Sequence, residues 1–117
     1  MVFMHIDSYQ FGEVVIDGVR YTSDCIILGG DVQADWWRKQ GHSLCPEDLE
    51  SVIAAGPSIL VVGCGVSGLM VVPETTRHVL QKHDIQLEAF STRKAVARFN
   101  ELSRTDANVA AALHLTC

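Results

Sequence analysis

The pattern of apolar and polar positions divides this chain into short strands and helices. Four apolar segments have the length and composition of strands that are partly or fully buried in a sheet. These segments are residues 25–28, 59–62, 85–90 and 109–115. The segment Ile59-Leu60-Val61-Val62 contains no polar position, which is typical of a strand covered on both faces. We therefore expect a central sheet with further layers on both sides.

Helix signals lie between and after these strands. Pro46 suits the first position of a helix that Gly56 is expected to end. A second helix is expected over residues 74–83. A third is expected over residues 93–103, where Ser91 or Thr92 can cap the N-terminus. The repeated alternation of strand and helix predicts a largely parallel sheet.

The N-terminal third has the signals of antiparallel strands. Asp17-Gly18 separates two β-prone segments, residues 13–16 and 19–22, and this dipeptide favours a two-residue hairpin turn. Residues 1–11 are expected to form a strand-like or irregular lead-in. The hairpin would add antiparallel strands to the sheet.

These elements predict one domain over residues 1–117, because a chain of this length has room for a single core. The expected fold class is α/β, a three-layer sandwich with a central mixed, mostly parallel sheet and an N-terminal β-hairpin. Residues 105–108 are expected to form the loop before the last strand.

Composition excludes several classes of protein. Apolar residues make up 48% of the chain and the formal net charge is −5, which excludes disorder and gives no basic surface for nucleic acid. The longest apolar run, residues 59–72, falls short of the roughly 20 residues needed to cross a bilayer. Four cysteines without a CxxC pair, and no visible export signal, favour free thiols. We expect a cytoplasmic protein with no membrane insertion.

A glycine-rich segment follows the most apolar strand. Residues 63–68 read GxGxxG, and Glu88 lies twenty positions beyond Gly68, as in dinucleotide-binding folds. Pro73 and the apolar residues before it weaken that interpretation. The alternatives are weak capture of an anion or small ligand by backbone amides, and a tight crossover without a ligand. The candidate ligand-binding residues are Gly63, Cys64, Gly65, Ser67, Gly68 and, from a neighbouring loop, His42.

Nucleophilic and metal chemistry are less well supported. Cys64 and Ser67 lie where a nucleophile could follow a buried strand, and His42 could act as its base. No acidic residue can be assigned to orient that histidine, and the segment is not a GxSxG elbow. His42 and Cys45 are three positions apart, but no further ligand has metal-site spacing. We therefore predict no catalytic residue, no bound metal and no cofactor.

Two adjacent tryptophans are the candidates for binding a protein partner. Residues 32–38 are expected to form a strand that carries Trp36 and Trp37 on opposite faces. One indole would then enter the core and the other would lie at the surface, as aromatic residues do at interfaces. The alternative is packing at the edge of the sheet without a partner.

The order and spacing of many short segments resemble the Mth-like domain family. The matching segments include residues 16–21, 37–44, 60–65, 92–100 and 109–114. This family of unknown function includes the adipogenesis-associated Mth-like protein and a mitochondrial complex I assembly factor. Its recurring features match at His42, Gly63, Gly65, Ala95 and Asn100. Many relatives have basic residues before the last strand, where this chain has Thr105-Asp106-Ala107-Asn108.

Two functions remain open at this point. The resemblance implies a non-catalytic interaction or assembly module, with protein partners such as subunits of a respiratory complex. The alternative is a small-molecule or anion-binding protein or enzyme that uses the segment Gly63 to Gly68 and the loop of His42. The sequence does not indicate the ligand, the partner or the oligomeric state.

Overall fold

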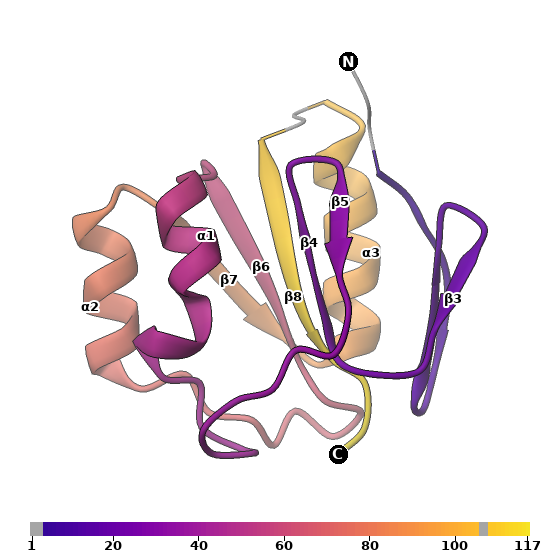
Figure 1. Ribbon diagram of the computed structural model, residues 1–117, viewed down its shortest axis with the longest axis horizontal. Helices are drawn as coiled ribbons and strands as arrows, with labels where there is room; N and C mark the ends of the chain where they lie inside the picture. The colour runs from indigo at the N-terminus through magenta and orange to yellow at the C-terminus, as the bar shows by residue number, and fades with distance from the viewer. Residues whose placement is uncertain (1–3, 106–107) are drawn as a thin grey trace.

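The centre of the molecule is a mixed sheet of five strands (Figure 1), seen in a computed structural model that describes residues 4–105 and 108–117. Its strands are β4 (Cys25–Leu28), β5 (Asp31–Gln33), β6 (Ile59–Cys64), β7 (Gln86–Phe90) and β8 (Val109–His114). They lie in the order β5-β4-β8-β6-β7. β6 pairs in parallel with β7 and β8, whereas β4 is antiparallel to β8 and β5. The expected mixed α/β fold is confirmed, although the sheet has as many antiparallel as parallel pairings.

Two hydrophobic clusters, one on each face of the sheet, produce three layers. Alternate side chains of β6 point to opposite faces, so that Val61 lies in one cluster and Leu60 and Val62 in the other. The pairing partners in β8 are alanines, for example Ala110 beside Leu60. Because all the residues of β6 after Ile59 are buried, the segment behaves as the interior strand that its apolar sequence predicts.

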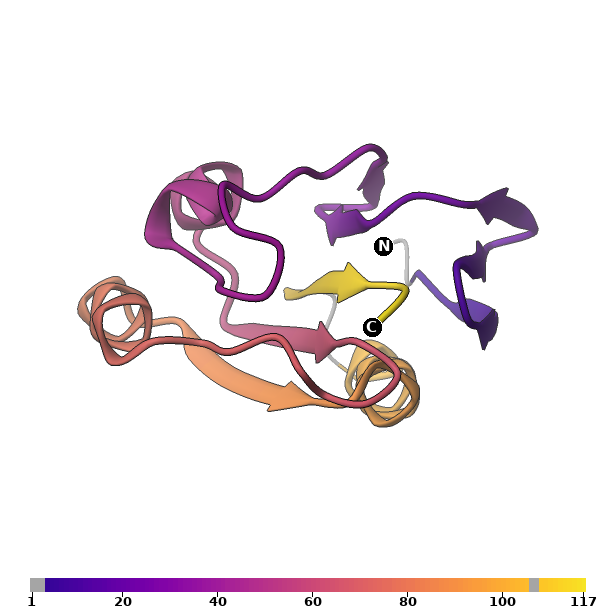
Figure 2. The same cartoon turned by 90° about the horizontal axis from the view of Figure 1, so that it is seen from below.

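The outer layers consist of helices and a small second sheet. One face of the central sheet is covered by helix α3 (Thr92–Ser103) and by the second sheet. The second sheet consists of the antiparallel strands β1 (Ile6–Gln10), β2 (Glu13–Ile16) and β3 (Val19–Tyr21). The 3-10 helix η1 (Pro46–Leu49), α1 (Glu50–Ala55) and α2 (Glu74–Lys82) cover the other face. Figure 2 shows α1 and α2 on one side of the sheet, with α3 and the small sheet toward the opposite side.

The predicted hairpin forms, but in its own sheet. Asp17 and Gly18 have φ angles of 46° and 82°, the left-handed values that a tight hairpin turn requires. β1 joins β2 and β3 to form the three-stranded sheet, so the hairpin does not extend the central one. Asn100 of α3 holds β1 in place, since its side chain accepts from the Ile6 amide and donates to the Ile6 carbonyl, both at 2.8 Å.

Most predicted helices and strands agree with the structure to within a few residues, with two corrections besides the placement of the hairpin. The strand expected over residues 32–38 ends at Gln33, because Asp35 adopts φ 55° and turns the chain away from the sheet. The expected side-chain cap of α3 is absent at Ser91, and the Thr92 hydroxyl bonds elsewhere. Positions 106 and 107 of the expected loop at 105–108 lie outside the described residues. Among the residues described, no helix is long and apolar enough to span a membrane.

Candidate functional site

The glycine-rich segment after β6 uses its backbone amides inside the protein. The Gly65 amide donates to Thr92 Oγ1 at 2.8 Å, the Val66 amide to the Thr116 carbonyl at 2.8 Å, and the Gly68 amide to the Gly65 carbonyl at 3.1 Å. No helix begins at Gly68, since α2 starts at Glu74. These three amides therefore do not form the phosphate cradle that the GxGxxG spacing suggested.

Close packing explains two of these glycines. A Cβ atom on Gly63 would lie 2.9 Å from Thr92 Oγ1, and one on Gly65 would lie 2.8 Å from the Thr116 carbonyl oxygen. Gly65 also has φ 98°, which side-chain-bearing residues rarely adopt. The Thr92 hydroxyl donates to the His114 carbonyl at 2.5 Å and accepts from Gly65. The segment thus joins β6, α3 and the end of β8.

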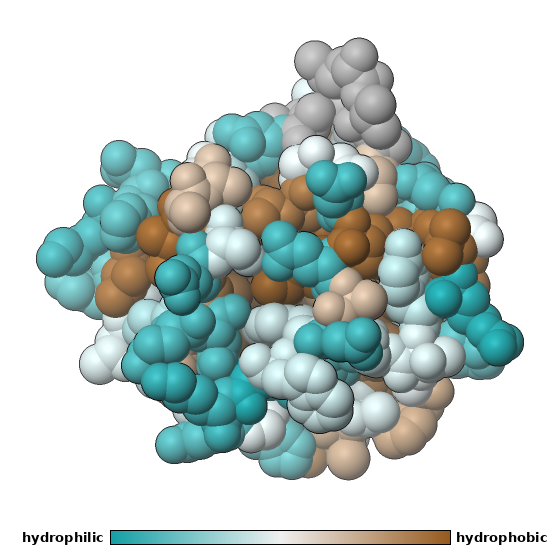
Figure 3. Space-filling model, viewed as in Figure 1, coloured by the Kyte–Doolittle hydropathy of each residue, from teal (hydrophilic) through white to brown (hydrophobic). Residues whose placement is uncertain are grey.

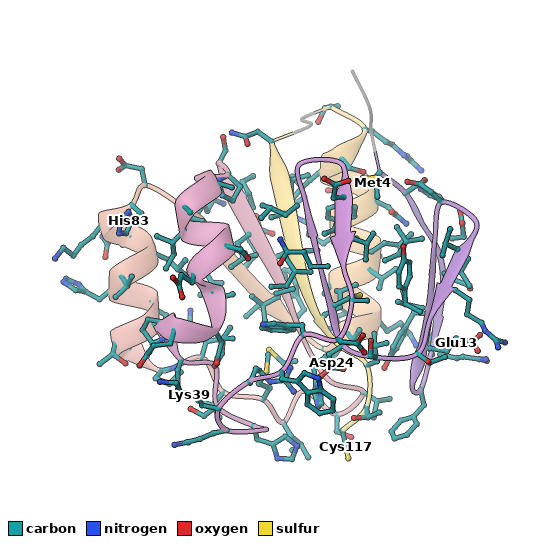
Figure 4. All side chains as sticks on the ribbon, viewed as in Figure 1. Met4, Glu13, Asp24, Lys39, His83 and Cys117 are labelled. Atoms are coloured by element: carbon teal, nitrogen blue, oxygen red, sulfur yellow. The ribbon has the colours of Figure 1, made fainter. Side chains whose placement is uncertain are left out.

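Beside this joint, a cluster of charged side chains lies at one end of the sheet. Arg38 Nη1 is 2.9 Å from Asp24 Oδ2, and His114 Nδ1 is 2.8 Å from the same oxygen. All three side chains are largely buried: Arg38 is 6% exposed, Asp24 17% and His114 8%. Figure 4 shows the labelled Asp24 near Cys117, at the end of the molecule opposite Met4.

Hydrogen bonds set the charge of this cluster. Burial raises the pKa of Asp24, but the Leu115 amide, His114 and Arg38 outweigh it and hold that pKa below its ordinary value of 3.8. His114 Nδ1 also lies 3.0 Å from Arg38 Nη2, and one nitrogen cannot both accept from Arg38 and donate to Asp24. Because Asp24 is an anion and lies closer, we assign the Nδ1 proton to the bond with Asp24.

His114 Nε2 then has no hydrogen-bond partner. The atom is buried, and no described residue lies within bonding geometry of it. The ring of His42 approaches edge-on, with the two centroids 5.9 Å apart. His42 itself is exposed, and its carbonyl accepts from the Val71 amide at 2.8 Å. The structure thus brings the predicted His42 loop to the end of β8, next to a histidine that belongs to no sequence motif.

A pocket of about 480 Å³ opens beside the charged cluster. Its lining includes both predicted tryptophans, the three clustered side chains and several small polar residues. These lining residues are Thr22, Ser23, Asp24, Asp35, Trp36, Trp37, Arg38, Gly41, His114 and Thr116. The pocket lies at the carboxyl ends of the parallel strands β6 and β8. Ligands of open α/β sheets usually bind at these strand ends. The ligand-binding residues expected from the sequence do not contribute to this lining. These are Gly63, Cys64, Gly65, Ser67, Gly68 and His42.

The two tryptophans have different environments. Trp36 is half-buried: its Nε1 donates to the Asp48 carbonyl at 2.9 Å, and the guanidinium carbon of Arg38 lies 4.8 Å from its ring centroid. Trp37 is 83% exposed. Neither indole therefore enters the core as expected: Trp36 packs partly buried against one hydrophobic cluster, Trp37 lies at the surface, and the two belong to a loop and not to a strand.

Cys64 has the environment of a structural thiol. The residue is 6% exposed, and burial raises its pKa while Arg77 lowers it to a smaller extent. Burial likewise raises the pKa of Cys25, to about 12. A protonated, enclosed thiol is a poor nucleophile. Within residues 4–105 and 108–117, no group of three histidine, cysteine or acidic side chains could hold a metal ion.

Sequence reasoning missed four residues of this pocket: Asp24, Asp35, Arg38 and His114. Each is a single polar residue without a motif around it. The one usable signal was position, because Asp24 precedes a buried strand and His114 ends another. With the strand order known, their antiparallel pairing would place these two residues at the same edge of the sheet.

Several shallower surfaces offer weaker alternatives. Figure 3 shows apolar side chains in a band across the middle of one face, including the region between α1 and β5. A pocket of about 460 Å³ lies there, with Glu47, Asp48 and Glu50 on its rim. It gathers no buried charged group comparable to the Asp24 cluster, so we take the pocket beside Trp37 as the candidate site.

Comparison with known proteins identifies the family but no activity. A protein described as an outer membrane protein from Bartonella henselae has 27% identity and a TM-score of 0.83, over 96% of this chain and 94% of that one. The conserved hypothetical protein PH1505 of Pyrococcus horikoshii has 25% identity and a TM-score of 0.81, over 96% and 98%. A Mth938-like domain from Bordetella pertussis, 20% identical, shares the fold with a TM-score of 0.68, over 97% and 86%.

The family model for a protein of unknown function, DUF498/DUF598, matches residues 6–114. This match spans the eight strands and three α-helices of the described residues. The resemblance to Mth-like domains is confirmed at this level, whereas the links to adipogenesis and to complex I assembly have no support in these matches. The chain belongs to the DUF498/DUF598 family, a group of small Mth938-like α/β domains of unknown function.

Proposed function

We propose that this domain is a non-catalytic interaction module that binds a protein partner through the end of the molecule that carries Trp37. An indole that is 83% exposed, on a loop held firmly from both sides, is the observation that carries the proposal. The Trp36 amide donates to the Asp24 carbonyl at 2.9 Å, and Arg38 is anchored in the charged cluster. Tryptophan is one of the residue types enriched at the energetic centre of interfaces.

Other exposed apolar side chains lie on loops at the same end of the molecule. We call them, together with Trp37, the apolar end: Phe11, Trp37, Val66, Leu69 and Val71. The neighbour of Phe11, Gly12, donates its amide to the Leu115 carbonyl, and Val66 donates to Thr116. In Figure 1 the loops that carry these residues and the C-terminus lie along one edge of the molecule. Concentration of apolar residues at one end is typical of a contact surface.

Capture from native cells tests this role. Tagged wild-type protein should recover a defined partner in a fixed ratio, for example the subunits of a respiratory complex. Trp37→Ser should lose at least nine-tenths of that partner, as an interface centre predicts. Val19→Ser is the matched control, because Val19 is also exposed but lies on β3, away from the apolar end. Equal recovery by all three proteins, or a bare monomer in each case, would contradict the proposal.

A second candidate function is the binding of a small molecule. The volume of the pocket, about 480 Å³, falls in the range of sites for small ligands. A fragment library screened by ¹H–¹⁵N correlation spectra should then give saturable shifts at Trp37 and at the amides around Asp24. Shifts scattered over the surface, with none at the pocket, would remove this candidate.

A further inference from the structure

The walls of the pocket carry one uncompensated charge. The charge of Arg38 is paired with that of Asp24, and the three side chains of Asp24, Arg38 and His114 contact one another at 2.8–3.0 Å, although Arg38 Nη1 and His114 Nε2 have no hydrogen-bond partner among the described residues. The fourth ionisable lining residue is Asp35, and its carboxylate makes no ion pair or hydrogen bond with any other described residue. The formal net charge of the protein, −5, has the same sign. The pocket is therefore electrostatically complementary to a cation.

The backbone holds Asp35 in one conformation next to Trp37. Its φ angle of 55° is left-handed, and its amide donates to Ser23 Oγ at 2.9 Å. The pocket lining thus combines an unpaired carboxylate on a held backbone with the exposed side chain of Trp37. An anion beside an aromatic ring recognises guanidinium and ammonium groups, through charge and through attraction to the face of the ring.

The protein itself contains an example of this chemistry. The guanidinium of Arg38 lies over the ring of Trp36, 4.8 Å from the centroid, and pairs with Asp24 at 2.9 Å. Trp37 and Asp35 are the same two residue types, on the same loop, facing the same pocket. Unlike Trp36 and Asp24, they have no cationic group of the described chain against them.

We propose that the pocket receives the guanidinium of an arginine side chain presented by a protein partner, which stacks on Trp37 and pairs with Asp35. The proposal rests on the interaction role proposed above, because it names the chemistry by which a partner engages the apolar end. Arginine fits better than lysine because its planar group can stack on an indole and donate to a carboxylate at the same time.

The first experiment compares two peptides that differ by one charge. Acetyl-Gly-Arg-Gly-amide and its citrulline counterpart have nearly the same shape, but only the first is a cation. Each is titrated into ¹⁵N-labelled protein, whose two tryptophans give two indole signals. The arginine peptide should shift the Trp37 indole saturably and leave the Trp36 indole, which bonds to Asp48, nearly unchanged. Equal shifts with the citrulline peptide would overturn the proposal.

Two variants locate the contact. Asp35→Asn keeps the left-handed backbone, which asparagine tolerates, and should weaken binding of the arginine peptide about fivefold or more. Asp31→Asn removes an exposed carboxylate from β5, outside the pocket lining, and should leave binding unchanged. Equal weakening by both variants would show a diffuse charge effect and overturn the proposal.

Two further outcomes separate this proposal from the interaction role itself. If Trp37→Ser abolishes capture of a partner while the arginine peptide does not bind, the interaction role stands and the arginine proposal fails. If free arginine amide binds more tightly than the peptide, the cation comes from a small molecule, and the partner-side-chain proposal fails. Saturable peptide binding that depends on Asp35 and is at least as tight as the binding of arginine amide supports the proposal.

Discussion

Asp24→Asn should lower the free energy of unfolding by about 3 kcal/mol at neutral pH, because it removes the counter-charge of a buried guanidinium. Arg38 is 6% exposed and lies 2.9 Å from the Asp24 carboxylate. Asparagine has the shape of aspartate, so the loss reports the charge and not a cavity. Urea denaturation of the two proteins at pH 7 gives the difference directly.

The effect should shrink in acid. The folded-state pKa of Asp24 is held below its ordinary value of 3.8, so its charge stabilises the fold fully above that value. This contribution is lost as the pH falls through the folded-state pKa. The difference between wild type and Asp24→Asn should therefore be largest near neutral pH and smaller below pH 3.8. A difference that is constant from pH 7 to acid would contradict this explanation.

Two comparisons test whether burial is the cause. Glu47→Gln breaks an ion pair with Lys39 whose side chains are 59% and 65% exposed, and it should leave stability unchanged. Adding Arg38→Met to Asp24→Asn removes the unpaired charge, so the double variant should be less destabilised than the sum of the single ones.

Thr92→Val should cost about 3 kcal/mol of stability, because it leaves two buried backbone groups without partners. The Thr92 hydroxyl accepts from the Gly65 amide at 2.8 Å and donates to the His114 carbonyl at 2.5 Å. Valine has nearly the same shape and the same branching at Cβ, so packing and helix propensity change little. Thermal or urea unfolding of the purified variant measures the loss.

Thr76→Val provides the matched control. Thr76 is also fully buried in the first turns of a helix, but its hydroxyl makes one bond, to the Leu44 carbonyl at 2.6 Å. We expect this variant to cost about half as much, since one backbone group loses its partner. Equal losses in the two variants would show that Thr92 does not join the three elements as described.

The helices and strands could be predicted where local pattern and burial agree. The apolar segment from Ile59 is buried, as it would be in almost any α/β packing, and Asp17-Gly18 favours a hairpin turn whatever sheet it belongs to. The strand with which the hairpin pairs could not be predicted in this way. Whether β2 joins the central sheet or pairs with β1 depends on contacts such as Asn100 with Ile6, which are 94 positions apart.

The loop from Asp35 to Arg38 shows where local pattern fails. Its tryptophans and Val32 favour a strand, but the left-handed turn at Asp35 and the ion pair of Arg38 remove it from the sheet. β-Propensity spans only about 1 kcal/mol and changes with context, so tertiary interactions readily override it. A prediction from neighbouring residues has no access to them.

The sequence by itself determined the α/β alternation, the buried strand before the glycines, the hairpin turn and the family, because these depend on short patterns and on their order. Only the tertiary structure decided the site. Asp24 and His114 are 90 positions apart and Arg38 and His114 are 76, so no local signal links them. They meet because the pairing of β4 with β8 brings both strand ends to one edge, where burial makes charge compensation necessary.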